Sequence, residues 1–206
     1  MQYTEHFPES QVPNANVVNR VDQFFDKFNL GQLSTICGIT KSKSISPKKL
    51  LMTLFTLPFL GQNLFRGVVR NSSCEFGKDA VYDFLGSPRF NWRRLLLMVA
   101  LTATIMTDAL TGNERETVLI LDDSSIHRPR AKKVELLAKH YDHCEKRYLK
   151  GFRTLTLAWS DGASLIPLDF ASLSSATPCN RYQNVTKNLD RRSCGAKRRR
   201  EAVTKS

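Results

Sequence analysis

The chain has 206 residues, of which 41% are hydrophobic, so it can form one sizeable domain or two small ones, and wholesale disorder is excluded. Its 31 basic and 19 acidic residues give a formal net charge of +12, which suggests a polyanionic partner, nucleic acid ahead of an anionic membrane surface. The excess is local, which indicates a located binding surface: residues 1–122 hold 13 basic against 11 acidic side chains, and residues 123–206 hold 18 against 8.

The first part of the sequence predicts helices. Apolar residues recur with a period near 3.6 over residues 15–30, which is typical of an amphipathic helix. Ser46 and Pro47 are suited to be the N-cap and the first residue of a second helix. Pro58 is expected to kink or end that helix, because proline lacks the N–H that a helix interior needs.

Two more helices are expected before residue 113. A short one is predicted at residues 77–86, closed by Gly86. The longest one is expected to begin at the Ser-Pro pair of residues 87–88 and to end near residue 112. We therefore expect a helical N-terminal domain over residues 1–112.

From residue 113 the pattern changes to that of a sheet. The apolar, β-branched run at residues 117–122 predicts a buried strand. Residues 132–151 suggest a short helix, or a helix plus a turn. Two strand-like runs on either side of Ser-Asp-Gly at residues 160–162 predict a hairpin. A charged helix is expected from residue 194, so the second predicted domain covers residues 113–206.

Two adjacent carboxylates, Asp122 and Asp123, follow the first predicted strand, and a basic segment comes directly after them. A carboxylate at the end of a central strand is a natural ligand for Mg²⁺, which usually takes one or two protein carboxylates plus substrate phosphates. The alternative is a strand-ending turn built from good capping residues. Because side chains alternate along a strand, only one of the two carboxylates can face a given site.

Several motifs then follow in order: LILDDSS at residues 119–125, KGFRTLTLAWSDG at 150–162, IPLDF at 166–170 and KNLDRRSCGAKRRREA at 187–202. This ordered set resembles the start of the catalytic domain of bacterial insertion-sequence transposases, which are DDE enzymes with an RNase H-like fold. The resemblance covers residues 117–202, and the helical part before it resembles the N-terminal domain that these proteins carry.

The resemblance implies a DNA transposase that uses Mg²⁺ (or Mn²⁺), held by three carboxylates, to cut the ends of an element and join them to target DNA. The first carboxylate corresponds to Asp123 or Asp122, of which Asp123 is preferred. The implied fold is of the α+β or α/β class, an N-terminal helical domain followed by the first half of an RNase H-like mixed sheet. No residue of this chain corresponds to the second Asp or the Glu of the family. We therefore expect an N-terminal fragment that binds metal weakly and has little or no strand-transfer activity alone.

Two basic clusters are candidates for contact with DNA phosphates, contacts that position a duplex rather than read its sequence. They are Arg128, Arg130, Lys132 and Lys133 after the first strand, and Arg191, Arg192, Lys197, Arg198, Arg199 and Arg200 near the C-terminus. We call them the loop cluster and the helix cluster. For the helix cluster, a frayed chain end is the main alternative.

Other polar residues suit structural roles better. Asp161 is expected to serve its turn, whereas Asp169 could neighbour the first strand, although neither matches the motif of the family. His140, His143 and Cys144 offer at most three zinc ligands, and a polar helix surface shared by the two histidines is the favoured interpretation.

The remaining composition bears on location. Five widely spaced cysteines without a Cys-x-x-Cys pair indicate reduced thiols rather than a disulfide framework. The first ten residues lack the apolar stretch of a signal peptide, and the longest apolar run, at 95–110, is shorter than the ~20 residues of a membrane span. We expect a soluble bacterial protein of the cytoplasm, associated with the nucleoid and without a membrane partner.

Two other functions remain open. A non-catalytic DNA-binding protein would use the helical half and the basic clusters, with a structural Asp pair and metal-independent binding. A sheet that lacks its later strands would instead expose an edge and apolar surface, and so self-associate or aggregate.

Overall fold

The computed structural model of the chain describes residues 14–40, 45–70, 74–111, 115–184 and 188–204. The chain divides into two compact units, residues 1–95 and 96–206. The division falls inside the longest helix, α5 (Trp92–Leu110). The domain boundary that the sequence predicts after residue 112 stays a prediction, since residues 112–114 lie outside the described residues.

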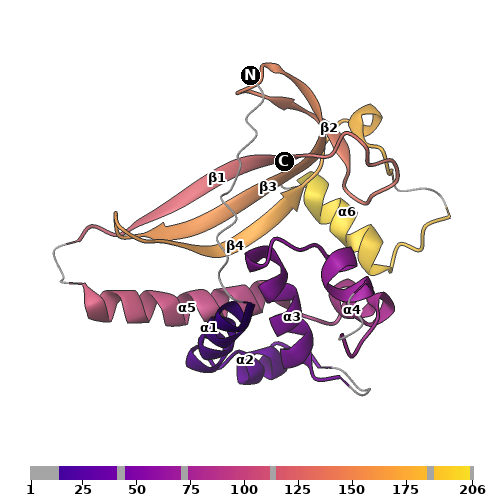
Figure 1. Ribbon diagram of the computed structural model, residues 1–206. Coiled ribbons are helices and arrows are strands. Elements are labelled where there is room, and N and C mark those ends of the chain that lie inside the picture. The colour runs from indigo at the N-terminus through magenta and orange to yellow at the C-terminus, as the bar shows by residue number, and fades with distance from the viewer. Residues whose placement is uncertain (1–13, 41–44, 71–73, 112–114, 185–187, 205–206) are drawn as a thin grey trace. The chain divides into compact units, whose positions relative to one another are not determined.

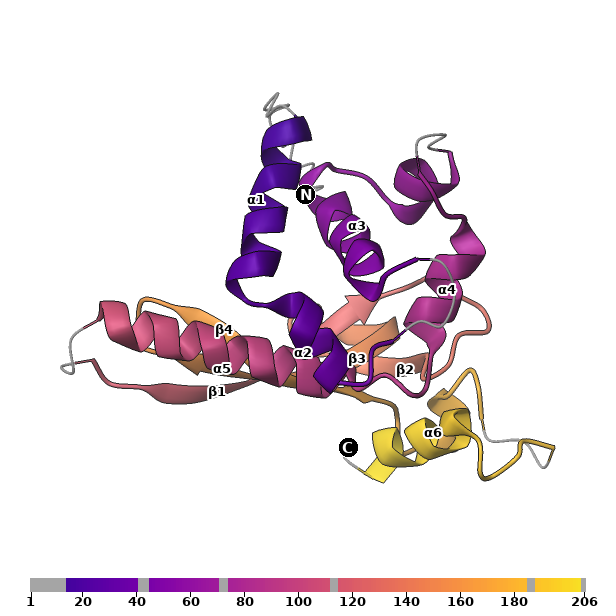
Figure 2. The same ribbon diagram turned by 90° about the horizontal axis from the view of Figure 1, so that it is seen from below.

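The first unit is helical, as predicted. Its elements are α1 (Asn14–Lys27), α2 (Leu30–Ile36), α3 (Pro47–Phe59), the π-helical turn η1 (Phe65–Val69), α4 (Lys78–Gly86) and the start of α5. Helices α1, α2 and α3 contact one another, and Figure 2 shows them as a group. The unit has a real core, in which Ile39, Leu50 and Val81 are completely buried.

The helix signals in the sequence are largely confirmed. The Ser46 side chain accepts a hydrogen bond from Lys49 N at 3.2 Å, and Pro47 opens α3. Helix α3 ends at Phe59, one residue after Pro58, and Leu60 is its C-cap residue. Helix α4 ends at Gly86 as expected.

The predicted start of the longest helix is wrong. Helix α5 begins at Trp92 rather than at Pro88, and Asn91 Oδ1 accepts a hydrogen bond from Arg94 N at 3.0 Å. Asparagine is among the strongest N-cap residues. The Trp92 and Phe90 rings also pack against Phe84, each with centroids 5.4 Å from it, which holds the intervening segment outside the helix.

The second unit contains a four-stranded antiparallel open sheet, so the expected mixture of helix and sheet is confirmed. Its elements after α5 are β1 (Val118–His127), β2 (Ala138–Asp142), β3 (Arg147–Ser160), β4 (Leu165–Leu173), the 3₁₀ turn η2 (Pro178–Asn180) and α6 (Cys194–Thr204). Strand β3 is central, with β1 along one side and β2 and β4 end to end along the other (Figure 1). The predicted hairpin is confirmed as β3–β4, with Gly162 in its turn at φ +85°.

The helix predicted within residues 132–151 is wrong. These residues form a connecting segment, β2 and the start of β3. The Asp142 carboxylate accepts hydrogen bonds from Cys144 N and Glu145 N, both at 2.9 Å, and so builds the turn between the strands. Tyr141 and Tyr148 face each other across the strands, with ring centroids 5.3 Å apart. Turn chemistry and this aromatic pair outweigh the helical propensity of the charged residues.

Strand β1 differs from its prediction in length and in burial. It continues past the Asp pair to His127, so the carboxylates lie in mid-strand rather than at its end. All ten of its residues are exposed, and β3 is its only partner among the described strands. Leu119 and Leu121 have relative exposures of 67% and 64%, so β1 is an edge strand and not the buried central strand that the apolar run suggested.

No disulfide joins the five cysteines, all of which are described. None of the described helices combines the length and the apolar character that crossing a bilayer requires.

Candidate DNA-contacting face of the sheet

Asp122 and Asp123 lie on opposite faces of the sheet, as the alternation of side chains along a strand demands. Asp122 accepts a hydrogen bond from Ser124 Oγ at 2.5 Å on its own face. Asp123 forms a two-pronged ion pair with the Arg153 guanidinium on β3. Nε of Arg153 is 3.2 Å from Oδ1 of Asp123, and Nη2 of Arg153 contacts Oδ2.

The register explains this pairing. Leu155 is the direct cross-strand partner of Asp123, and Arg153 precedes Leu155 by two residues in β3, so it lies on the same face and within diagonal reach of Asp123. The carboxylate of Asp123 raises the pKa of Arg153 by accepting its hydrogen bonds. The pair is charge-assisted, although each side chain remains about two-fifths exposed, at 40% for Arg153 and 38% for Asp123.

The same face continues onto β2, where His140 and Asp142 lie. Burial is the main cause that lowers the pKa of His140, and the positive charge of Arg153 adds to it, so the imidazole is neutral at pH 7. The backbone N–H of Glu145 is the main cause that lowers the pKa of Asp142. This face therefore brings Asp123, Arg153, His140 and Asp142 together.

The described residues do not by themselves fit a complete Mg²⁺ site. Asp122 points away from Asp123, and both oxygens of Asp123 already accept from Arg153. In the part of the chain that the structure describes, no three His, Cys, Asp or Glu side chains are grouped so that they could hold a metal ion. The two carboxylates of the Asp pair therefore do not converge on one ion.

Asp161 and Asp169 do not complete the site. As predicted, Asp161 serves its turn, where it accepts from Ala163 N and Ser164 N and pairs with Arg115 Nη1 at 2.9 Å. Asp169 does not neighbour the first strand, contrary to the expectation, because it lies on β4 and β3 separates β4 from β1.

The two histidines of the His-Tyr-Asp-His-Cys stretch were expected to share the polar surface of a helix. This prediction is wrong, because the stretch forms a strand and a turn. His140 is 7% exposed on β2, whereas His143 is exposed in the turn after it. His143 packs its ring edge-to-face on Tyr141, with centroids 5.1 Å apart. The strand register separates the roles of these histidines, one buried and one at the surface.

The loop cluster lies on the connection from β1 to β2. Its four side chains, those of Arg128, Arg130, Lys132 and Lys133, are all exposed. The connection is anchored at one end by Arg128 N, which donates to Lys150 O at 2.8 Å, and at the other by Leu137, which is completely buried. The loop cluster is thus carried on a segment fixed to the sheet at both ends.

The helix cluster lies on α6 and just before it. Ala196 and Ala202, each 2% exposed, anchor α6, and Ser174 N donates to Ala202 O at 3.2 Å. Figure 1 shows α6 beside the end of β4. This anchoring disfavours the frayed end that was the alternative. The Arg198 guanidinium donates to both carboxylate oxygens of Glu135, at 3.1 and 2.9 Å.

The Glu135–Arg198 pair brings the two basic clusters together. Glu135 is two residues after Lys133, and Arg198 is in the middle of the helix cluster, although the two are 63 positions apart in the chain. Arg198 is thereby occupied, Nε of Arg199 is buried, and one Nη of Arg200 donates to Arg191 O at 3.2 Å. Arg191, Arg192 and Lys197 are exposed.

Sequence reasoning missed Arg153, Glu135 and the role of His140. Arg153 interrupts the apolar residues on one face of β3, but only the strand register shows that Asp123 stands beside it. No family model matches the chain, and the curated proteins contain no match to it.

Proposed function

We propose that the chain acts on DNA as part of a DDE-type transposase, with an RNase H-like domain in which Asp123 is the first catalytic carboxylate. The ordered motifs from residue 117 onward support this proposal. A further support is the sheet order β1–β3–β4, a meander that begins with the strand bearing the Asp. Among the two candidates, Asp123 is preferred because its face also holds Arg153, His140 and Asp142.

The observation that carries the DNA-binding part is the convergence of the two basic clusters through Glu135 and Arg198. The loop cluster alone offers four exposed cations on a connection anchored to the sheet. Cations held side by side on anchored segments can neutralise successive phosphates, and each such contact releases condensed counterions. The affinity for DNA is therefore expected to fall steeply with salt.

The decisive experiment is a titration of fluorescent duplex DNA at several salt concentrations, read by anisotropy. The test variant replaces Arg128, Arg130, Lys132 and Lys133 with Gln. The matched control removes the same charge from exposed residues of the first unit, by replacing Arg20, Lys27, Arg66 and Lys78 with Gln.

The slope of log K against log salt is expected to shrink by roughly 0.9 for each phosphate that the loop-cluster variant no longer neutralises. The control variant should keep the slope of the unmodified chain. Equal reductions in both variants would show that binding follows net charge alone and would refute a located surface.

Strand transfer by this polypeptide alone is not part of the proposal. The described residues do not group three metal-ligating side chains, and the parts of a catalytic unit do not contribute separately. Mg²⁺ or Mn²⁺ would thus be a cofactor of a complete three-carboxylate site, to which Asp123 contributes one ligand.

The Asp123–Arg153 ion pair favours a second function, that of a non-catalytic DNA-binding protein in which Asp123 is structural. The two functions differ in the effect of Asp123→Asn. If Asp123 is a metal ligand, Mg²⁺ should change DNA affinity in the unmodified chain more than in this variant. If the second function holds, the affinity should be the same with and without metal, and the same in both proteins.

A further inference from the structure

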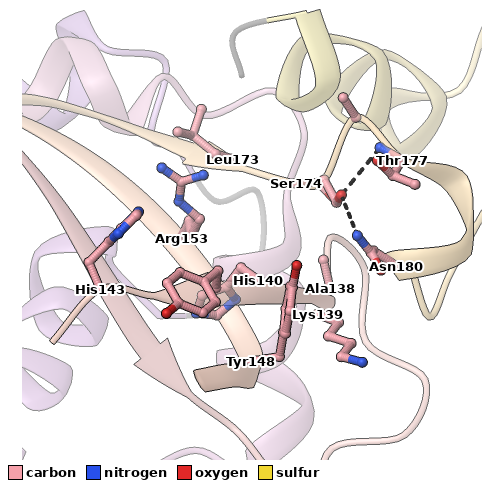
Figure 3. A pocket seen from close by; sticks show the side chains of 13 residues that line it. Ala138, Lys139, His140, His143, Tyr148, Arg153, Leu173, Ser174, Thr177 and Asn180 are labelled. Atoms are coloured by element: carbon pink, nitrogen blue, oxygen red, sulfur yellow. Dashed lines mark hydrogen bonds between the residues drawn. The ribbon is translucent and has the colours of Figure 1, made fainter. Parts of the chain in front are cut away.

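A cavity opens on the sheet unit at the junction of β2, β3 and the segment that follows β4. Its volume is about 310 Å³, and its lining includes Lys139, His140, Arg153, Ser175 and Thr177 (Figure 3). It lies wholly within residues 138–180, so it belongs to a single compact unit. We call it the β2–β4 pocket.

His140 is the polar group that the pocket leaves without a partner. The backbone of Ala138 partly offsets the lowering of its pKa, but neither ring nitrogen makes a hydrogen bond of ordinary geometry to a described atom. The side chain lines the pocket while the residue is only 7% exposed. Buried polar groups in folded proteins are nearly always hydrogen-bonded, because an unmade bond costs the desolvation of the group. An unpartnered buried imidazole therefore indicates a ligand that supplies the missing bond.

The pocket presents hydrogen-bond donors and positive charge. Arg153 donates to Asp123 through one N–H of Nε and one of Nη2. The other N–H groups of its guanidinium can donate to another acceptor. Lys139 points to the opposite face of β2 from His140, and its ammonium lies 4.9 Å from the centroid of the Tyr148 ring there. No Asp or Glu is among the lining residues.

Ser175 adds a hydroxyl donor. Its Oγ accepts hydrogen bonds from Thr177 N at 3.2 Å and from Asn180 Nδ2 at 3.4 Å, drawn as dashed lines in Figure 3. With both acceptor positions used, the hydroxyl hydrogen remains to be donated. A guanidinium, an imidazole and a hydroxyl on the lining of one pocket match the oxygens of a phosphate group, for which arginine is particularly suited.

We propose that the β2–β4 pocket binds a phosphate group through Arg153 and His140. The group is either a phosphate of DNA or a free inorganic phosphate, which share the same oxygens. The DNA source rests on the proposed function, whereas binding of inorganic phosphate does not. The DNA-contacting surface then extends from the two basic clusters into a defined pocket.

The test follows the His140 ring resonances by NMR in the full chain while inorganic phosphate is added at constant ionic strength. His140→Gln assigns the resonance among the four histidines of the chain. The test variant is Arg153→Gln, which removes the guanidinium from the pocket. The matched control is Arg147→Gln, because Arg147 lies on the same face of β3 and also pairs with a carboxylate but does not line the pocket.

A saturable shift of the His140 signals is expected, with affinity weakened about tenfold in Arg153→Gln and unchanged in Arg147→Gln, since the first variant loses one charge-assisted bond. No saturable shift up to tens of millimolar phosphate, or equal weakening in both variants, would overturn the proposal. The control also reports whether general charge screening causes the effect.

A second titration, with duplex DNA added to the phosphate-loaded protein, separates the two sources. Displacement of phosphate from His140 identifies a DNA phosphate as the occupant, whereas simultaneous binding identifies free phosphate, and either result supports the pocket. DNA binding by anisotropy without any response at His140 would overturn the pocket and leave the proposed function standing. A His140 response to phosphate without DNA binding would do the reverse.

Discussion

Gly151 is the position at which a single methyl group should do most damage to the sheet. It lies on β3, where His127 of β1 pairs on one side and Ala138 of β2 on the other. A Cβ built on Gly151 would lie 2.1 Å from the carbonyl oxygen of Ile126 and 3.1 Å from the Cα of His127. Both atoms belong to backbone, which cannot move aside as the end of a flexible side chain can. Gly151→Ala must therefore displace the end of β1, together with the loop cluster that follows it.

The expected loss of stability is the difference between two opposing effects. Overpacking of this kind costs about 1–3 kcal/mol, and replacing glycine with alanine returns ~0.4–1 kcal/mol by restricting the unfolded chain. We expect Gly151→Ala to destabilise the sheet unit by about 1–2 kcal/mol. Urea unfolding, read by Trp159 fluorescence in a Trp92→Phe background, reports the sheet unit because these are the two tryptophans of the chain.

Gly195→Ala is the matched control. Its added Cβ would meet only side-chain atoms, the nearest 3.8 Å away on Arg198 and Glu135, and it lies within α6, where alanine is favoured over glycine. It should stabilise the sheet unit by ~0.4–1 kcal/mol. If Gly151→Ala unfolds at the same urea concentration as the unmodified chain, with the same slope, the close approach of β1 and β3 at Gly151 is refuted.

Three further outcomes follow from the same structure. A double-mutant cycle on Asp123→Asn and Arg153→Gln, measured by urea unfolding, should give a coupling energy of ~0.2–1 kcal/mol, because both side chains are about two-fifths exposed. A coupling energy near zero would contradict the ion pair. Burial lowers the pKa of His140 in the folded state, so the unfolded chain binds a proton at this residue at a higher pH than the folded chain does. The contribution of His140 to the free energy of unfolding should therefore be constant above about pH 6.5 and decrease as the pH falls below that value. His140→Gln should flatten that decline in a pH series of unfolding curves, and an unchanged decline would count against the assignment. If the open edge of β1 mediates self-association, sedimentation should show association that rises with protein concentration and disappears in Leu119→Lys, because a charge on an edge strand opposes further strand pairing. Association that survives this substitution would point to another surface.

The helical half could be predicted closely because its signals are local. The cap of Ser46, the stop near Pro58 and the end at Gly86 depend on a few neighbouring residues each. The start of α5 was missed for a reason that is not local. The packing of Phe90 and Trp92 on Phe84 decides where that helix begins, and sequence periodicity contains no such information.

The sheet could be predicted only where two strands adjoin along the chain. The β3–β4 hairpin follows from its Ser-Asp-Gly turn, whereas the pairing of β1 with β3 joins segments that a connection separates. Apolar content in residues 117–122 suggested burial, but burial depends on how many partners a strand has, and β1 has one among the described strands. The Asp pair, which was expected at the end of its strand, therefore lies in mid-strand.

Arg153 belongs to both of the proposed sites on this face of the sheet. Its guanidinium is held by Asp123 on one side and lines the β2–β4 pocket on the other. A cation that takes the Asp123 carboxylate removes the partner of Arg153 and leaves its positive charge to the pocket, so the pocket should then bind phosphate more tightly. By thermodynamic reciprocity, phosphate bound to Arg153 must favour the cation at Asp123 by the same factor. If both proposals hold, Arg153 therefore couples Asp123 to the β2–β4 pocket.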